Sequence, residues 1–124
     1  ASLDGHVDNV LSVQFAPNGH HLATGSCDNS LRIWDLRKRR CAYTILAHSK
    51  LISNVIYHPN NGDFLLSSSY DNTVKIWSAR DYQLINTLHG HEGRVMRVQM
   101  SMDGKMIAST SFDRTWKLWM ADED

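Results

Sequence analysis

Residues 47–77 read AHSKLISNVIYHPNNGDFLLSSSYDNTVKIW, and the three positions that decide the fold are His48, Asp71 and Trp77. The same trio of residue types occurs once before this stretch and once after it. The histidines lie 42 and 43 residues apart, the aspartates 43 and 42, and the tryptophans 43 and 42. Chance does not keep three residue types in phase over a whole chain, so the sequence is built from repeats. The other two trios are His6, Asp28, Trp34 and His91, Asp113, Trp119.

This period, with a His near the start and a Trp near the end of each repeat, is typical of a four-stranded propeller blade of about 40–45 residues. Each repeat opens with an alternating strand pattern, followed by Gly- or Asn-containing turns and shorter strand patterns. The sequence therefore predicts an all-β propeller fold. The predicted strands are 10–15, 21–26, 31–35 and 41–46 in the first repeat, 52–57, 64–69, 74–77 and 83–88 in the second, and 95–100, 106–111 and 116–119 in the third, with the end of a further strand at Ser2-Leu3.

A propeller blade buries its faces only against neighbouring blades, so a closed ring needs roughly 4–8 of them. Three blades therefore predict part of a larger ring, which we take to be seven-bladed. The predicted units are repeats at 1–46, 47–88 and 89–120 and an acidic tail at 121–124. The third repeat stops after its third strand, so its blade is expected to lack the fourth. The resulting open edge at Trp116–Trp119 is expected to pair with another chain, and such a fragment to self-associate.

Composition narrows the possible partners. Thirteen Lys and Arg balance 13 Asp and Glu, so bulk charge gives no reason to expect non-specific binding to nucleic acid. Cys27 and Cys41 occupy non-equivalent repeat positions, which indicates no disulfide framework and fits a reducing compartment. No apolar run approaches the length that crosses a membrane, and no signal peptide is visible. We expect no membrane partner and no cofactor, although a targeting segment could precede a chain that begins inside a repeat.

A Ser or Thr lies four residues before each repeated Asp, and with it the chain resembles the WD-repeat family. The resemblance implies that His, Ser or Thr, Asp and Trp form a structural tetrad in each repeat. Asp accepts a hydrogen bond from one imidazole nitrogen, the hydroxyl bridges, and the indole N–H donates to it. Ser26, Ser69 and Ser111 lie two residues further on and could be confused with the bridging residues. The implied tetrads are His6, Thr24, Asp28, Trp34; His48, Ser67, Asp71, Trp77; and His91, Ser109, Asp113, Trp119.

Two chemical alternatives compete with a structural role for these residues. A His, Ser and Asp set also suggests nucleophilic catalysis, but three copies in phase favour a fold device, because an enzyme needs one site. His89-x-His91 and His20-His21 suggest metal ligands. His91 already belongs to a repeated set, and adjacent residues on a strand point to opposite faces. We therefore expect neither enzyme activity nor a metal site.

The resemblance also implies which residues face the top surface of the ring: those three and five positions after the His and one before the Asp. Large apolar residues and an Arg at such positions are typical of interface hot spots. The alternative is that some of them pack against one another around the central channel. We expect Tyr70, Arg94 and Phe112 to form one continuous patch. The full set is Asn9, Leu11, Cys27, Leu51, Ser53, Tyr70, Arg94, Met96 and Phe112.

A basic run, Arg37, Lys38, Arg39 and Arg40, follows the third predicted strand of the first repeat. It is expected in a turn on the opposite, bottom rim of the ring. The simplest interpretation is a solvated hairpin. The functional alternative is a contact to RNA phosphate or to an acidic protein segment, and a nuclear-localisation signal is a weaker one.

Longer stretches resemble one group within the family, the spliceosomal WD-repeat proteins of the particle that contains the paired fourth and sixth small nuclear RNAs. The resemblance implies a non-enzymatic, nuclear scaffold that helps assemble the tri-snRNP for pre-mRNA splicing. It implies other splicing proteins as partners, including a cyclophilin-type one, and small nuclear RNA bound directly or indirectly. The stretches are ATGSCDNSLRIWDLRKRRCAYTILAH (23–48), GDFLLSSSYDNTVKIW (62–77) and HGHEGRVMRVQMSMDGKMIASTSFDRTWKLWMADED (89–124).

The chain departs from the WD-repeat pattern at two places. Asp35 follows Trp34, but Ser78 and Met120 stand at the equivalent positions, and Ala47 replaces the Gly that precedes the first and third His. Neither departure touches the tetrads. The competing function is that of a generic WD-repeat adaptor, such as a substrate receptor of a ubiquitin ligase or a signalling scaffold, because fold does not imply function.

Overall fold

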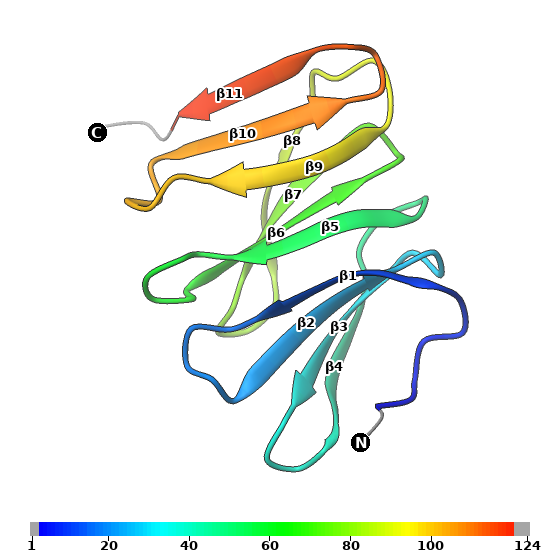
Figure 1. Ribbon diagram of the computed structural model, residues 1–124, viewed down its shortest axis with the longest axis vertical. Coiled ribbons are helices and arrows are strands. Elements are labelled where there is room, and N and C mark those ends of the chain that lie inside the picture. The colour runs from blue at the N-terminus through cyan, green and yellow to red at the C-terminus, as the bar shows by residue number, and fades with distance from the viewer. Residues whose placement is uncertain (1–2, 121–124) are drawn as a thin grey trace.

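The computed structural model describes residues 3–120, which form three antiparallel sheets and, within that range, no helix (Figure 1). In each sheet the strands lie side by side in chain order. The first sheet consists of β1 (Val10–Phe15), β2 (His21–Ser26), β3 (Ser30–Asp35) and β4 (Arg40–Leu46), the second of β5 (Ile52–Tyr57), β6 (Phe64–Ser69), β7 (Val74–Ser78) and β8 (Leu84–Leu88), and the third of β9 (Val95–Met100), β10 (Met106–Ser111) and β11 (Trp116–Met120).

The predicted all-β fold of three blades is confirmed, and each strand predicted within residues 10–119 is present with ends that differ by one residue at most. In the described residues β11 pairs only with β10, so the third sheet has three strands, as expected. The prediction of a strand at Ser2-Leu3 is wrong for Leu3, which lies outside any strand. Ser2 and the tail at 121–124 fall outside the described residues.

Local sequence explains the turns between strands. The residue after each repeated Asp adopts a left-handed conformation, with φ of 69° at Asn29, 74° at Asn72 and 74° at Arg114. Asn tolerates this conformation well, whereas Arg does so rarely. Gly25 on β2 is required for a different reason. A Cβ atom there would lie 2.5 Å from the side chain of Ile52, so the absence of a side chain lets β5 approach the first sheet.

The burial of equivalent positions shows how the sheets depend on one another. Val10, Val13 and Phe15 on β1 are 50%, 60% and 64% exposed, whereas their equivalents on β5 and β9 are at most 8% exposed. The residue types are similar, so the difference comes from the sheet that precedes β5 or β9 and covers it. A blade face becomes core only when a second blade packs on it. The equivalents are Ile52, Val55 and Tyr57 on β5 and Val95, Val98 and Met100 on β9.

The other end of the array shows the same dependence. Leu31 on β3 and Val74 on β7 are completely buried, while Trp116, at the equivalent position of β11, is 69% exposed. One apolar core lies between the first and second sheets, and another lies between the second and third. The three sheets form an open arc, and their cores are the two seams between neighbours.

The innermost strands β1, β5 and β9 lie side by side and form one face, which we call the channel wall (Figure 1). Several hydrogen bonds join them across the seams, and two of these are made by equivalent repeat positions. The Ser12 hydroxyl oxygen accepts from the Val55 N–H at 3.0 Å, and the Asn54 side-chain oxygen accepts from the Val98 N–H at 3.1 Å.

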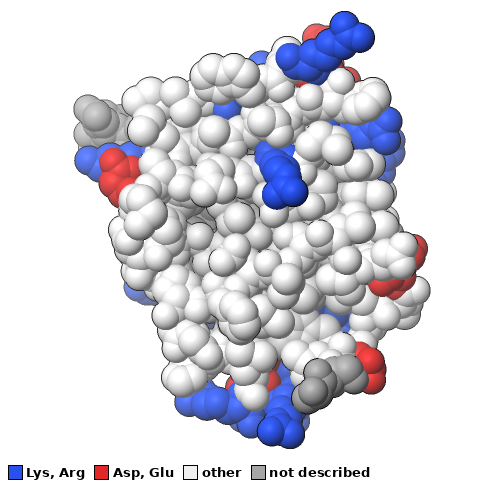
Figure 2. Space-filling model, in the orientation of Figure 1, with Lys and Arg blue, Asp and Glu red and all other residues white. Residues whose placement is uncertain are grey.

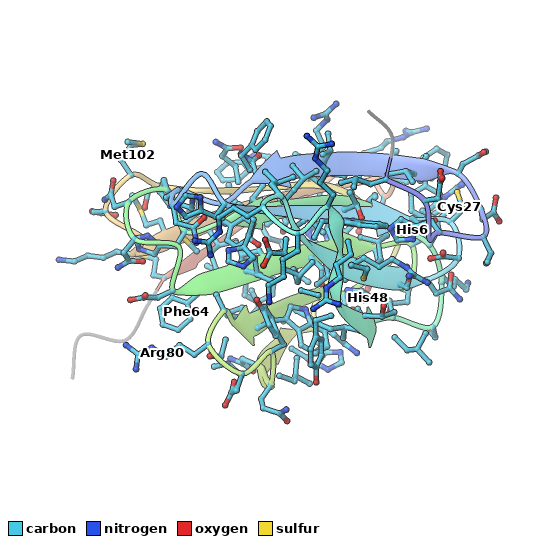
Figure 3. All side chains as sticks on the ribbon, turned by 90° about the horizontal axis from the view of Figure 1, so that it is seen from below. His6, Cys27, His48, Phe64, Arg80 and Met102 are labelled. Atoms are coloured by element: carbon cyan, nitrogen blue, oxygen red, sulfur yellow. The ribbon has the colours of Figure 1, made fainter. Side chains whose placement is uncertain are left out.

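The strands alternate in direction, so the turns gather at two rims. We call the rim with the β2–β3, β6–β7 and β10–β11 turns the top rim, and the opposite one, with the β3–β4 and β7–β8 turns, the bottom rim. Figure 3 shows His6, Cys27 and His48 toward one end of the molecule and Phe64, Arg80 and Met102 toward the other. Each predicted functional residue can therefore be assigned to a rim, to the channel wall or to the interior.

Candidate functional site

In the second repeat the four predicted tetrad side chains form one continuous set of hydrogen bonds. His48 Nδ1 lies 2.8 Å from Asp71 Oδ2, and His48 Nε2 lies 2.7 Å from Ser67 Oγ. The indole N–H of Trp77 donates to the same Ser67 oxygen at 2.9 Å. Because a carboxylate only accepts, the proton sits on Nδ1, and Nε2 accepts from the Ser67 hydroxyl. Every polar atom in this chain of bonds has a partner.

The first repeat shows the same arrangement. His6 Nδ1 lies 2.9 Å from Asp28 Oδ2 and His6 Nε2 lies 2.6 Å from Thr24 Oγ1, to which the Trp34 indole N–H donates at 2.8 Å. Thr24 and Trp34 are buried. Thr and Ser are thus interchangeable as the bridging hydroxyl.

The third repeat keeps only half of the relay. His91 Nε2 lies 2.7 Å from Ser109 Oγ, and the Trp119 indole donates to Ser109 at 3.1 Å. His91 Nδ1, however, is 3.9 Å from Asp113 Oδ2, which is too far for a hydrogen bond. The Asp113 side chain is 19% exposed, against 11% for Asp71. The expected hydrogen bond between His and Asp is therefore absent where the sheet has no fourth strand among the described residues.

Each repeat contains a further hydroxyl that was not predicted from the sequence. Ser30, Thr73 and Thr115 lie two residues after the repeated Asp, and each hydroxyl donates to Oδ1 of that Asp. The distances are 2.5 Å for Ser30 and 2.6 Å for Thr73. The signal was present in the sequence, because Asp-x-Ser or Asp-x-Thr recurs in phase in all three repeats.

The hydroxyls two residues before the Asp have a role distinct from bridging. Ser69 Oγ donates to the Leu51 carbonyl at 2.7 Å and accepts from the Asp71 N–H at 3.1 Å. Ser26 and Ser111 make equivalent bonds in their repeats. These residues fix the turn that presents the Asp and take no part in the relay to Trp.

These contacts set the charge states of the carboxyl groups. Burial alone raises the pKa of Asp71, but hydrogen bonds from His48 and Thr73 outweigh it and hold the pKa far below the ordinary value of 3.8. Burial raises the pKa of Asp28 in the same way, and hydrogen bonds led by Ser30 and His6 bring it well below 3.8. These hydrogen bonds keep both Asp28 and Asp71 ionised at neutral pH.

The third repeat differs in its titration as well. The Thr115 hydroxyl is the main cause that lowers the pKa of Asp113 to about 2. Burial lowers the pKa of His91 below 6.5, and the nearby charge of Asp113 opposes this only in part. A neutral imidazole is therefore favoured at this position.

The bridging serine hydroxyls of the second and third tetrads are not placed to attack a substrate. Ser67 and Ser109 are completely buried, and each hydroxyl oxygen already has a His and a Trp as partners. A nucleophilic oxygen must reach the reacting carbon of a bound substrate. The His-Ser-Asp sets are thus placed as internal hydrogen-bond networks.

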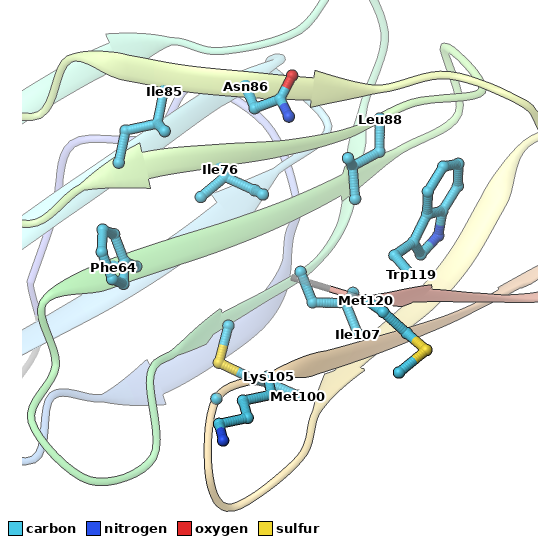
Figure 4. A pocket seen from close by; sticks show the side chains of 11 residues that line it. Phe64, Ile76, Ile85, Asn86, Leu88, Met100, Lys105, Ile107, Trp119 and Met120 are labelled. Atoms are coloured by element: carbon cyan, nitrogen blue, oxygen red, sulfur yellow. The ribbon is translucent and has the colours of Figure 1, made fainter. Parts of the chain in front are cut away.

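The outer seam between the second and third sheets contains a cavity of about 310 Å³ (Figure 4). Its walls are mostly apolar, and Asn86 and Lys105 are the polar side chains among them. No carboxyl or imidazole group belongs to this lining, so the cavity lacks an acid–base pair. The apolar walls are Phe64, Ile76, Ile85, Leu88, Met100, Ile107, Trp119 and Met120.

Residues 3–120 hold no cluster of three or more His, Cys, Asp or Glu side chains of the kind that binds a metal ion. Cys27 and Cys41 are both unpaired thiols in the described structure. No helix within this range is long and apolar enough to cross a membrane.

On the top rim the structure brings Tyr70, Arg94 and Phe112 together. The guanidinium carbon of Arg94 lies 5.0 Å from the centre of the Tyr70 ring and 4.4 Å from that of Phe112. Phe112 is 65% exposed, and Arg94 is also exposed. Stacking of this kind contributes about 0.5–1 kcal/mol at an exposed site. We call these three residues the Arg94 clamp.

The other predicted top-surface residues differ in how far they are exposed. Asn9, Leu11 and Met96 are exposed, as a binding surface requires, and Cys27 and Leu51 are half-buried. Ser53 follows the packing alternative, because its hydroxyl donates to the Val95 carbonyl at 2.6 Å across the seam.

The basic run lies on the bottom rim. Arg37, Lys38 and Arg39 form the β3–β4 turn, while Arg40 already belongs to β4. The buried Asp35 carboxylate accepts from the N–H groups of Arg37 and Lys38 at 3.0 and 3.2 Å and so fixes the turn. All four basic side chains are exposed, and Figure 2 shows Lys and Arg gathered at the lower edge, where Figure 1 places this turn.

Comparison with known proteins gives relatives that match part of the chain. Striatin-3 of Rattus norvegicus is 40% identical over 63 residues, which is 48% of this chain and 8% of that protein. The ribosome biogenesis protein BOP1 homolog of Dictyostelium discoideum is 38% identical over 56 residues, 45% of this chain and 7% of that protein. The U5 small nuclear ribonucleoprotein 40 kDa protein of Pongo abelii is 36% identical over 52 residues, 42% of this chain and 15% of that protein. The matched stretches thus span at most 15% of these three relatives.

The family described as WD domain, G-beta repeat matches residues 1–35, 39–78 and 82–120. The second match begins just before β4 and ends with β7, so it takes the outer strand of one sheet and three strands of the next. These limits differ from the predicted units 1–46, 47–88 and 89–120, which follow the sheets and stay a prediction. Three matches that cover most of the sequence, on three antiparallel sheets in an open arc, show that the chain belongs to the WD40 repeat family.

Proposed function

We propose that this chain belongs to a non-enzymatic protein-interaction scaffold whose binding surface is the top rim. The observation that supports this most strongly is the Arg94 clamp. It joins the turns of two neighbouring sheets and exposes an Arg between two aromatic rings. Arg and aromatic residues contribute most to interface energies, and a propeller holds its loops rigidly in place.

The tetrads have a structural role in this proposal. They lie in the interior, they recur in each repeat, and their hydroxyls are shared between His and Trp. Breaking such a network leaves buried groups without partners, which costs about 1–3 kcal/mol for each group. The network therefore holds the top-rim turns in position, and partners contact the residues beside it.

The scaffold we propose is part of a spliceosomal small nuclear ribonucleoprotein and acts in the nucleus, in tri-snRNP assembly and pre-mRNA splicing. Two similarities support this assignment. The stretches 23–48, 62–77 and 89–124 resemble the C-terminal blades of pre-mRNA-processing factor four, and the chain is 36% identical over 52 residues to a U5 small nuclear ribonucleoprotein component. Its partners would be splicing proteins, including a cyclophilin-type one, and small nuclear RNA.

The second candidate is a generic WD-repeat adaptor, such as a ubiquitin-ligase substrate receptor or a signalling scaffold. The chain is 40% identical to Striatin-3 and 38% identical to the BOP1 homolog over the matched stretches, against 36% for the U5 protein, so its similarity is not specific to splicing proteins. Both candidates use the same surface. They differ in the partners that this surface retains.

A pull-down from nuclear extract with the full-length protein separates the two candidates. The test variant combines Tyr70→Ala with Phe112→Ala, and the matched control combines Tyr43→Ala with Phe64→Ala, two partly exposed aromatic residues outside the top rim. We expect wild type and control to retain splicing proteins and small nuclear RNA, and the test variant to lose protein partners at any salt concentration. Retention of ubiquitin-ligase or signalling components instead would support the adaptor. Unchanged partners in the test variant would contradict the top-rim assignment.

A further inference from the structure

The channel wall is nearly free of charge. Among the residues of β1, β5 and β9, Arg97 on β9 is the single charged side chain. Figure 2 looks onto this face, which is almost entirely uncharged apart from one basic group over β9. Within the described residues, Arg97 is therefore the group on this face that can select a partner by charge.

The equivalent positions show what Arg97 does not do. Ser12 and Asn54 occupy the same repeat position, and each accepts a hydrogen bond from a backbone N–H of the following sheet. A guanidinium has five N–H donors and no acceptor, so Arg97 cannot repeat this seam contact. Among residues 3–120, Arg97 makes no ion pair with a carboxylate, and its side chain is exposed.

Arg97 borders a hollow of about 520 Å³ in the channel wall. Leu11 and Met96 supply exposed apolar groups to this hollow, Ser12, Gln14, Ser53 and Asn54 supply polar ones, and no Asp or Glu lines it. Tyr70 also lines it, and the same Tyr70 ring stacks on Arg94 in the clamp. The hollow is therefore continuous with the top rim, and a partner held on the rim can extend into the channel wall.

We infer that Arg97 binds the carboxylate of an acidic peptide segment that runs from the top rim into this hollow. The inference rests on the proposed scaffold function and names the chemistry of its partner. A guanidinium holds a carboxylate through two parallel hydrogen bonds, a geometry that the single ammonium group of a lysine does not match. Neighbouring apolar residues of the segment pack on Leu11 and Met96. A nucleic acid fits this site poorly, because phosphate binding relies on several basic contacts and the wall has one.

Peptide selection on the full-length protein tests the inference. A phage-displayed library of random dodecapeptides is selected on wild type, and the affinity of the recovered peptides is measured by fluorescence anisotropy. We expect Asp or Glu to be enriched at one position. Arg97→Gln, or Gln in place of that Glu, should weaken binding about tenfold or more, and both changes together should weaken it no further. Arg97→Glu should instead select peptides with Lys or Arg at that position.

Arg80→Gln, an exposed arginine toward the bottom rim, is the matched control and should leave peptide affinity unchanged. Recovery of no peptide, recovery without acidic enrichment, or affinity that is insensitive to Arg97→Gln would each overturn the inference. So would a loss of thermal stability in Arg97→Gln without a loss of affinity, because Arg97 would then hold an adjoining blade. The scaffold proposal fails separately, if the Tyr70→Ala and Phe112→Ala variant retains all its partners.

Discussion

Tyr70 and Asp71 are neighbours in the chain, yet the structure uses them in opposite ways. Asp71 points inward and accepts hydrogen bonds from His48 and Thr73, while Tyr70 stacks under the exposed Arg94. The same division separates Asp113 from Phe112 in the next repeat. A single turn thus supplies one residue to the interior and the next to the surface. Substitutions one position apart should therefore affect different properties of the protein.

The largest effect is expected for Asp71→Ala. The substitution leaves the His48 imidazole, the Thr73 hydroxyl and two backbone N–H groups without their acceptor. We expect the free energy of unfolding of the complete protein to fall by about 3 kcal/mol. Urea denaturation measures this change, and Asp81→Ala on the exposed β7–β8 turn is the control. Full stability combined with a lost activity would require the site to be reassigned as functional.

A smaller loss is expected for Asp113→Ala. His91 already lies 3.9 Å from this carboxylate, and Asp113 is more exposed than Asp71. The substitution therefore removes fewer buried partners, and we expect a cost of about 1 kcal/mol in the same denaturation experiment. Equal costs for Asp71→Ala and Asp113→Ala would show that the third relay is as complete as the second in solution.

Acid should affect the repeats over different pH ranges. The folded-state pKa values of Asp28 and Asp71 lie below 3.8, the ordinary value. Their contribution to folding stability is therefore complete above about pH 3.8 and is lost as the pH falls further. The folded-state pKa of His91 lies below 6.5, so the unfolded chain gains a proton first, and stability declines as pH falls below 6.5.

Hydrogen exchange with intrinsic rates corrected for pH measures this difference. Between about pH 7.5 and about pH 5.5, protection should fall in β9–β11 more than in β5–β7. His91→Asn, which cannot gain a proton, is the control and should remove the pH dependence of the third sheet. Equal changes in both sheets would contradict the assignment to His91.

The smallest effect is expected at the bottom rim. Replacement of Arg37, Lys38, Arg39 and Arg40 by Ser should weaken the recovery of RNA-containing particles, mainly at higher salt. Protein partners of the top rim should stay bound. The exposed side chains make electrostatic contacts that salt screens, and the Asp35 contacts that fix the turn use only backbone N–H groups. Pull-downs across a salt series measure the effect. If the variant has the same salt dependence as wild type, the basic run is a solvated turn without a binding role.

Much of the fold followed from the sequence because each pattern occurs three times in phase. The strands came from alternating patterns and turn residues, and the repeated His, Asp and Trp came from their spacing. The tetrads and the positions of Tyr70, Arg94 and Phe112 came from the family resemblance. The incomplete third relay could not be predicted, because it depends on what covers β11. Arg97 was missed for a related reason. Its equivalents, Ser12 and Asn54, bond to backbone groups, so the position shows no repeated residue type.

The most direct test of this account is a comparison of Asp71→Ala with the Tyr70→Ala and Phe112→Ala variant in the complete protein. Stability is measured by urea denaturation and binding by pull-down at a temperature where both variants are folded. We expect Asp71→Ala to lose about 3 kcal/mol of stability and to keep its partners, while the aromatic variant loses only about 1–2 kcal/mol, from its two stacking contacts with Arg94, and loses its protein partners. The reverse pattern, or a joint loss of both properties in each variant, would contradict the division of this turn into a structural and a binding residue.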